Sequence, residues 1–573
     1  MDSDDEDLKL AMAMSLQANS PRAGHGSASG DKHESIDLTS DTEDEDDEDL
    51  RRAIALSMQE SGNNDMQQSS ASSVSTTRVA KTAAVVDKPL GFMGMDRKAM
   101  ELERLARLGK RKREASPEAP SKQVARAPTA RSDSDETLLQ YPNGAIKRTF
   151  ASKYPRTDDI TIEELLEADR VNTAVISSFQ YDSGWLYEKL DPTKVKQIWL
   201  MTGKHRGEDV QAKRIQEWRE SRVPNMKLHF PPMGGMIASM HSKFMLLFGK
   251  DKLRIAIPTA NMTQTDWGEV ANDWQPGIME NSVFLIDLPR RHGGTVTEAK
   301  DLTPFGRELV YFLEQQEVGP QVITGLLKCD FTKTGHLAFV HSIGGSHKTE
   351  SNHPTGLPGL ARAIRELHLD EVEHIELDYA ASSLGSINDA FLSRIRLAAC
   401  GGPFGTNTAP EANVRDCFRI YFPTNDTVEK SMGGPEGAGI ITLTRQSYNA
   451  PSFPRECMRD YDSMRRGMLS HNKLLFARGR RRNGKAFAWV YVGSANISEA
   501  AWGGQKLLKS GQMGSLNIRN WECGVVMPVP EAKLRGLKQD DVPPMSVFDG
   551  TIEVPFRVPA DEYKGKQPWF FRS

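Results

Sequence analysis

Two pairs of residues, each a histidine with a lysine two positions later, are the part of this 573-residue sequence best suited to chemistry. They are His241 with Lys243 and His471 with Lys473. A neutral imidazole can attack phosphorus while a second, protonated imidazole supplies a proton to the leaving oxygen. Two ammonium groups can stabilise the charge that develops on the phosphate oxygens. The pairs therefore predict phosphodiester chemistry that needs no metal ion, although they leave the roles of the two histidines symmetric.

An asparagine follows each pair in a similar local sequence. Asn261 lies within residues 259–263 and Asn496 within residues 494–498, and a Trp-Gly pair follows each asparagine at the same interval. We expect the two tryptophans, Trp267 and Trp502, to pack beneath the site. One His-x-Lys pair arises often by chance, but two copies in the same order, 230 residues apart, indicate a duplicated phosphate site.

The elements that position these residues are predicted from hydrophobic runs. Residues 172–176 and 198–201 read as buried strands, and residues 209–222 and 360–369 as helices. This alternation predicts α/β layers around a mainly parallel or mixed sheet. Each His-x-Lys pair is expected to open a strand, where its two side chains share a face. Packing of the halves about a pseudo-two-fold axis would bring both pairs to one cleft.

The duplicated pattern resembles the phospholipase D superfamily. Most of that superfamily has an aspartate a few residues after each lysine, where this chain has Phe248 and Arg478. This departure is similar to the tyrosyl-DNA phosphodiesterase family, and so are four segments: residues 173–186, 382–386, 494–503 and 521–524. The resemblance spans roughly residues 150–573. It implies an α/β fold of two similar α-β-α sandwich domains related by a pseudo-two-fold axis, expected at 141–326 and 327–573.

The resemblance also implies an activity, which is removal of tyrosine, left by stalled topoisomerase I, from DNA 3′ ends. It makes His241 the nucleophile that forms a covalent phosphohistidine with the DNA 3′-phosphate. His471 then protonates the departing tyrosine and activates the water that hydrolyses the intermediate. No cofactor is implied.

Six further residues receive roles from the same resemblance. The phosphate oxygens are held by Lys243, Lys473, Asn261 and Asn496. Glu522 orients and polarises His241, and Asn272 is the nearest match to the amide partner of His471.

Two other features are expected near the cleft. Ser382 and Ser383 follow a predicted strand and can cap the next helix, and the resemblance adds a contact with phosphate. A basic run is expected to flank the cleft and attract phosphates, and it comprises Arg478, Arg480, Arg481, Arg482 and Lys485.

Residues 1–140 are predicted to be a disordered tail, because they are too poor in apolar residues to offset their ordering entropy. Two segments, 4–17 and 46–60, each place an acidic cap before a short helix with one apolar stripe. Both resemble ubiquitin-interacting motifs. Their stripes are Leu8, Ala11 and Ser15 in the first copy and Leu50, Ala53 and Ser57 in the second.

The tail carries two more short motifs. Residues 36–39, followed by an acidic run, resemble a SUMO-interacting motif that binds by strand addition. Residues 110–113 form a basic patch of the kind that directs proteins to the nucleus.

Composition excludes several other classes. No apolar run approaches the length of a membrane span, and the acidic N-terminus does not fit a secretory or transit signal. Five widely spaced cysteines predict neither a disulfide framework nor a zinc site. Together, the resemblance and the tail motifs imply a nuclear, monomeric DNA-repair enzyme. The alternatives are another phospholipase D-type nuclease or lipid phosphodiesterase, and a ubiquitin- or SUMO-binding scaffold with an inactive catalytic body.

Overall fold

The structure is a computed structural model that describes residues 139–202, 215–216, 218–220, 223–234, 237, 239–269, 279–405, 413–508, 513–537 and 542–571. Three predictions lie outside these residues. They are the disorder of the tail, its ubiquitin, SUMO and nuclear motifs, and most of the helix at 209–222.

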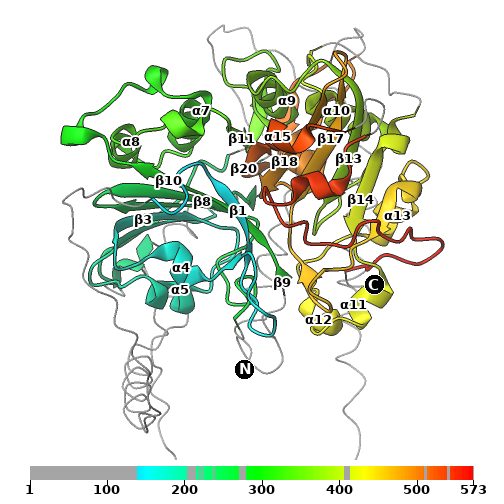
Figure 1. Ribbon diagram of the computed structural model, residues 1–573. Helices are drawn as coiled ribbons and strands as arrows, with labels where there is room; N and C mark the ends of the chain where they lie inside the picture. The colour runs from blue at the N-terminus through cyan, green and yellow to red at the C-terminus, as the bar shows by residue number, and fades with distance from the viewer. Residues whose placement is uncertain are drawn as a thin grey trace, which may run out of the picture. The chain divides into compact units, whose positions relative to one another are not determined.

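The first sheet is built from strands within residues 145–289 (Figure 1). These are β1 (Ala145–Thr149), β2 (Asp159–Ile160), β3 (Val171–Ser177), β4 (Lys196–Leu200), β5 (Met226–His229), β7 (Phe244–Gly249), β8 (Lys252–Pro258) and β10 (Ser282–Pro289). They lie in the order β2-β1-β10-β8-β7-β3-β4-β5.

The second sheet is built from strands within residues 338–528. These are β11 (Ala338–Ser342), β13 (Val372–Ala380), β14 (Phe418–Phe422), β15 (Met458–Asp460), β17 (Leu474–Arg481), β18 (Ala486–Gly493) and β20 (Asn520–Pro528). Their order is β11-β20-β18-β17-β13-β14-β15.

The two sheets repeat one topology. In the first, β10, β8, β7 and β3 are antiparallel neighbours, and β4 and β5 then continue parallel to β3. In the second, β20, β18, β17 and β13 are antiparallel, followed by parallel β14 and β15. The predicted duplication and the mixed α/β fold are therefore confirmed. The boundary at 326/327 stays a prediction.

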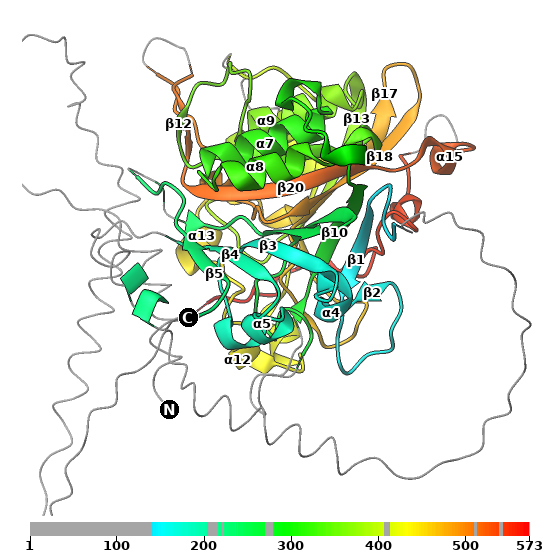
Figure 2. The same ribbon diagram turned by 90° about the vertical axis from the view of Figure 1, so that its left-hand side faces the viewer.

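Helices cover the sheets in layers (Figures 1 and 2). The first sheet has α4 (Ile162–Leu166) and α5 (Ser183–Lys189) on one face and α7 (Pro304–Gln315) and α8 (Pro320–Leu327) on the other. The second packs its outer face on α9 (Gly356–Glu366) and α10 (Asp389–Ala399). The other α-helices of the described residues are short: α11 (Asn425–Glu429), α12 (Gly434–Gly437), α13 (Arg445–Asn449), α14 (Glu499–Trp502) and α15 (Glu531–Leu534).

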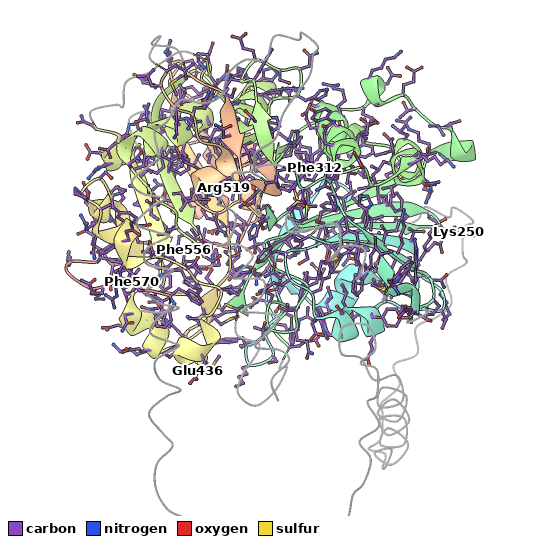
Figure 3. The ribbon with its side chains drawn as sticks, turned by 180° about the vertical axis from the view of Figure 1, so that it is seen from behind. Lys250, Phe312, Glu436, Arg519, Phe556 and Phe570 are labelled. Atoms are coloured by element: carbon purple, nitrogen blue, oxygen red, sulfur yellow. The ribbon has the colours of Figure 1, made fainter. Side chains whose placement is uncertain are left out.

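The strand alternation divides the core. In β7, Phe244, Leu246 and Phe248 enter the core that both repeats share, and the intervening residues enter the core formed with α4 and α5. Phe312 of α7 lies in the shared core, with its ring centroid 5.8 Å from that of Trp521 in β20 (Figure 3). Burial of these faces fixes the two repeats against each other.

Two pairs of short strands join the repeats reciprocally. β6 (Ser239–Met240) of the first repeat pairs in parallel with β20 of the second. β16 (Leu469–Ser470) of the second pairs in parallel with β9 (Met279–Glu280) of the first. A contact that recurs with the partners exchanged is the mark of a two-fold relation. Both His-x-Lys pairs directly follow one of these crossing strands.

Within the part of the chain that the structure describes, no helix is both long and apolar enough to cross a membrane.

Candidate active site

The two His-x-Lys pairs lie in three-residue connections between strands, and not within strands as predicted. One connection links β6 to β7 and the other links β16 to β17. The backbone N–H of His241 donates to the carbonyl of Trp521 (3.0 Å), and that of His471 donates to the carbonyl of Glu280 (2.9 Å). Each histidine is therefore held by the opposite repeat.

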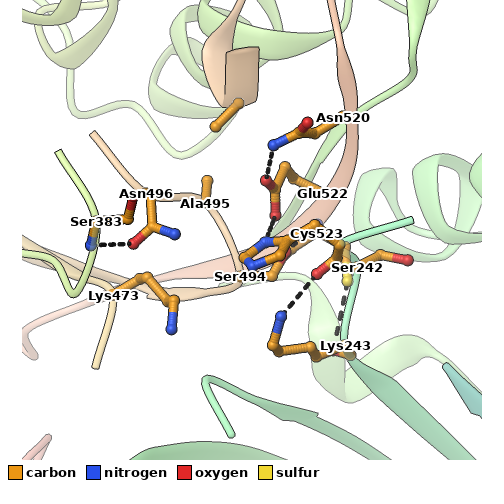
Figure 4. Close-up of polar contacts among 12 residues, drawn as sticks. Ser242, Lys243, Ser383, Lys473, Ser494, Ala495, Asn496, Asn520, Glu522 and Cys523 are labelled. Carbon is orange, nitrogen blue, oxygen red and sulfur yellow. Dashed lines mark hydrogen bonds and ion pairs between the residues drawn. The ribbon is translucent and has the colours of Figure 1, made fainter. Parts of the chain in front are cut away.

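His241 is paired with Glu522, as predicted by the resemblance. Nδ1 of His241 lies 2.8 Å from Oε2 of Glu522, and Asn520 donates to the other carboxylate oxygen (3.0 Å; Figure 4). Burial lowers the pKa of His241 to about 4, and the charge of Glu522 opposes this effect. Because Nδ1 donates to the carboxylate, Nε2 carries the free lone pair of the neutral ring.

Lys243 and Lys473 are fully buried, and their ammonium groups point into the same space (Figure 4). Lys243 donates to the backbone carbonyl of His241 (3.0 Å), and Lys473 to that of His471 (2.5 Å) and of Thr259 (3.4 Å). Burial lowers the pKa of Lys243 to about 8, and burial together with Lys243 lowers that of Lys473. Two crowded cations of this kind favour binding of an anion.

Asn496 is oriented by the serine pair. Its Oδ1 accepts from the backbone N–H of Ser383 (3.1 Å) and from the hydroxyl of Ser382 (3.3 Å). The amide nitrogen of Asn496 is thereby left as the donor on the other side of the side chain. Contact of the serines with phosphate stays a prediction, since the structure gives both of them a role in holding Asn496.

Asn261 is the buried counterpart in the first repeat. Its Nδ2 donates to Oε1 of Gln180 (3.1 Å), and the carboxylate of Asp266 accepts its backbone N–H (2.6 Å). Asn261 Oδ1 is buried without a hydrogen bond to the described residues.

Asn272, predicted as the amide partner of His471, lies outside the described residues. Asp266 lies beside that histidine instead, with Oδ2 3.3 Å from Nδ1. Burial, reinforced by the charge of Lys473, lowers the pKa of His471 to about 3, and Asp266 opposes this shift. Sequence reasoning missed Asp266, because alignment of the two repeats places an alanine, Ala501, at the equivalent position and so marks no shared site residue there.

Phe179 was also missed as a site residue. It follows β3, with its ring centroid 5.3 Å from that of His241 and 5.9 Å from the ammonium nitrogen of Lys243. An aromatic face at this distance attracts the cation of Lys243.

The Trp-Gly pairs are structural, as predicted for the tryptophans. Trp267 and Trp502 are buried, and Nε1 of Trp267 donates to the carbonyl of Asn261 (2.9 Å). Gly268 and Gly503 both have positive φ, 73° and 94°, which favours glycine. Trp267 therefore holds the turn that carries Asn261. In the second repeat, Nε1 of Trp502 donates to the hydroxyl of Tyr379, which donates to the carbonyl of Ala495 (2.8 and 2.9 Å).

The basic run does not flank the site, so that expectation was wrong. Arg478 belongs to β17 and pairs with Asp378 (3.1 Å). The turn at 482–485 lies at the far end of β17, about 25 Å from Lys473 at 3.3 Å per strand residue.

Among the described residues, no three His, Cys, Asp or Glu side chains form a group that could hold a metal ion.

Comparison with known proteins gives the following similarities. The family described as tyrosyl-DNA phosphodiesterase matches residues 145–564, and the ubiquitin interaction motif matches residues 3–17 and 45–61. Tyrosyl-DNA phosphodiesterase 1 of Arabidopsis thaliana is 24% identical over 422 residues, which are 69% of this chain and 64% of the relative. The Drosophila melanogaster protein of the same name is 23% identical over 381 residues, 64% of this chain and 62% of the relative. The match thus spans less than two thirds of either relative.

The fold is also similar to a solved structure. The crystal structure of yeast tyrosyl-DNA phosphodiesterase superposes with a TM-score of 0.54 at 18% identity, covering 75% of this chain and all of the yeast chain. At this identity the likeness concerns the fold alone.

Proposed function

The chain belongs to the tyrosyl-DNA phosphodiesterase family, and on this premise we propose that it is a DNA-repair phosphodiesterase that hydrolyses the bond between tyrosine and a DNA 3′-phosphate. The observation that carries the proposal is the convergence of both His-x-Lys pairs. Each lysine lies close enough to the histidine of the other pair to lower its pKa: Lys473 lowers that of His241, and Lys243 that of His471. Tyrosine from stalled topoisomerase I is the expected adduct.

In the first step, Nε2 of neutral His241 attacks phosphorus, and a P–N bond forms as the bond from phosphorus to the tyrosine oxygen breaks. His471 gives its Nε2 proton to that oxygen. In the second step, neutral His471 removes a proton from water, whose oxygen attacks phosphorus. The P–N bond then breaks, leaving a 3′-phosphate and neutral His241.

The lysines and asparagines stabilise the transition state. Lys243, Lys473 and the side-chain amides of Asn261 and Asn496 face the non-bridging oxygens, where charge develops during both steps. Their burial strengthens this interaction relative to water.

The low pKa of His471 is consistent with its role as a proton donor once substrate is bound. Burial and Lys473 disfavour its protonation in the protein alone. A bound phosphodiester brings a negative charge beside both lysines, so it raises the pKa of the histidine and favours proton uptake. The donor is therefore charged mainly when there is a leaving group to protonate.

The direct test is cleavage of an end-labelled oligonucleotide with a 3′-phosphotyrosine by the full chain, with excess EDTA. Release of tyrosine that leaves a 3′-phosphate is expected. Turnover only of plain DNA or of a phospholipid would indicate another phospholipase D-type activity. A folded chain that binds ubiquitin and turns over nothing would instead be a scaffold.

The histidine roles need a second experiment, which compares covalent protein–DNA adducts. His471→Ala is expected to accumulate the adduct with His241, because hydrolysis needs the general base. His241→Ala should form none. An adduct that survives loss of His241 and needs His471 would reverse the assignment.

We further propose that the tail recruits the enzyme in the nucleus. The two matched motifs suit ubiquitin, residues 36–39 suit SUMO, and residues 110–113 suit nuclear import. The chain is proposed to act as a monomer. Replacing the basic patch should abolish nuclear accumulation.

Ubiquitin binding is tested with two double variants, Ala11→Gly with Ala53→Gly and Ser15→Asp with Ser57→Asp. Each should lose binding.

A further inference from the structure

Among the described residues, Asp266 is the charged residue beside Nδ1 of His471. Oδ2 of Asp266 lies 3.3 Å from Nδ1, and the side chains of Asp266 and His471 are 1% and 5% exposed. That nitrogen is buried, and it makes no hydrogen bond to the described residues, Asp266 included. A small tightening of this contact gives a charge-assisted hydrogen bond.

Asp266 is itself held in place by its own repeat. Its Oδ2 accepts the backbone N–H of Asn261 at 2.6 Å. Nδ2 of Asn281 lies 3.4 Å from Oδ1 and 3.1 Å from the backbone carbonyl of Asp266. These contacts prevent the carboxylate from turning away from the histidine.

The internal repeat shows that this contact is not a copy of the one at His241. Thr259 exchanges hydrogen bonds with Ser282, as Ser494 does with Cys523, so Asn281 is the equivalent of Glu522. Asn281 carries no charge, and its side chain hydrogen-bonds Thr259 and Asp266. The charge comes from Asp266, whose own equivalent is Ala501.

We propose that Asp266 is the positioning residue of His471, holding its Nδ1–H so that Nε2 faces the leaving tyrosine. Each histidine then receives one carboxylate from the opposite repeat, Glu522 for His241 and Asp266 for His471. The two carboxylates occupy non-equivalent positions of the repeat.

This arrangement suits a histidine that must become protonated. Lys473 and Lys243 both disfavour a positive charge on His471, and Asp266 counters them. Burial disfavours ionisation of Asp266, but His471 and the Asn261 N–H outweigh it and lower the pKa of Asp266. A charged carboxylate therefore faces the ring whenever the ring is protonated.

The inference rests on the proposed function, and the leaving group of the substrate tests it. One oligonucleotide carries a 3′-phosphotyrosine and the other a 3′-p-nitrophenyl phosphate. The tyrosine phenolate, whose conjugate acid has a pKa of about 10, needs a proton as it leaves, and the more stable p-nitrophenolate does not. First-turnover rates are measured for the wild-type chain, Asp266→Asn and Glu522→Gln.

Asp266→Asn is expected to slow first-turnover release of tyrosine about 10²-fold and release of p-nitrophenol less than about threefold. Glu522→Gln, which acts on the nucleophile, is expected to slow both. The covalent adduct should also accumulate on Asp266→Asn, because His471 activates the water.

Equal slowing of both substrates by Asp266→Asn, or slowing of neither, would overturn the inference. Failure of the wild-type chain on both substrates would overturn the proposed function instead. Should Asp266→Asn not fold, Asp266→Ser, whose hydroxyl can still accept the Asn261 N–H, takes its place in the same comparison.

Discussion

Nδ1 of His241 lies 2.8 Å from Oε2 of Glu522, although the two residues are 281 positions apart and belong to different repeats. The contact exists because β6, directly before His241, pairs with β20, which contains Glu522. The proposed nucleophile of the first repeat is therefore paired with a carboxylate of the second.

Replacing Glu522 with glutamine keeps the shape of this contact and removes its charge. We expect adduct formation to slow about 10²-fold, since the imidazole loses the partner that makes Nε2 more nucleophilic. Rapid-quench measurement of the adduct with a 3′-phosphotyrosyl oligonucleotide checks this. Asn520→Ala, which removes only one hydrogen bond to the carboxylate, should cost about fivefold, corresponding to about 1 kcal/mol. Equal losses in the two variants would argue against a role for the charge.

The lysine pair predicts an alkaline limit to activity. Lys243 is charged below its pKa of about 8 and neutral above it, so kcat/KM should fall as pH rises through this range. Lys473 faces Lys243, so the loss of activity reflects titration of the two lysines as a coupled pair. The groups Glu522, Asp266 and Cys523 also face Lys243.

Lys243→Arg separates this effect from others. The guanidinium stays charged at every accessible pH, so the fall should move to higher pH even though the rate at pH 7 is lower. A pH profile of kcat/KM for both proteins is the measurement. A profile that stays flat to pH 10 in the wild type would contradict the prediction.

The orientation of Asn496 predicts an order among three variants. Because its Oδ1 is occupied by Ser382 and Ser383, its Nδ2 is the group left to donate to the phosphate in the proposed mechanism. Asn496→Asp replaces that donor with a negative acceptor, so it should reduce kcat/KM more than Asn496→Ala. Ser382→Ala should have the smallest effect, about fivefold. The steady-state kinetics of these variants would contradict the assignment if Asn496→Asp were the most active.

The two Trp-Gly pairs predict unequal stability losses. A Cβ on Gly268 would lie 1.7 Å from the backbone oxygen of Phe150, and one on Gly503 would lie 2.5 Å from the side chain of Leu516. Both alanines also face positive φ, at about 1–3 kcal/mol each. Since a side chain can move more easily than backbone, Gly268→Ala should lower the free energy of unfolding more than Gly503→Ala. Urea denaturation of the two variants gives the order directly.

The sequence alone determined the chemistry of the site and the duplication behind it. His-x-Lys, Asn and Trp-Gly recur in the same order in both repeats, and Asn precedes Trp by the same six residues. Order and short spacing are properties of the local sequence, so they can be read without the fold. The strand alternation of residues 244–248 likewise follows from a period of two.

The tertiary structure decided which partner each of these residues receives. Asp266 at His471 and Glu522 at His241 depend on how β16 pairs with β9 and β6 with β20. Ser382 reaches Asn496 within the second repeat, across 114 positions of the chain. These pairings join segments far apart in the chain, and they arise only when both sheets bury their inner faces together. The residue types were therefore local information, whereas their electrostatic environment came from non-local packing.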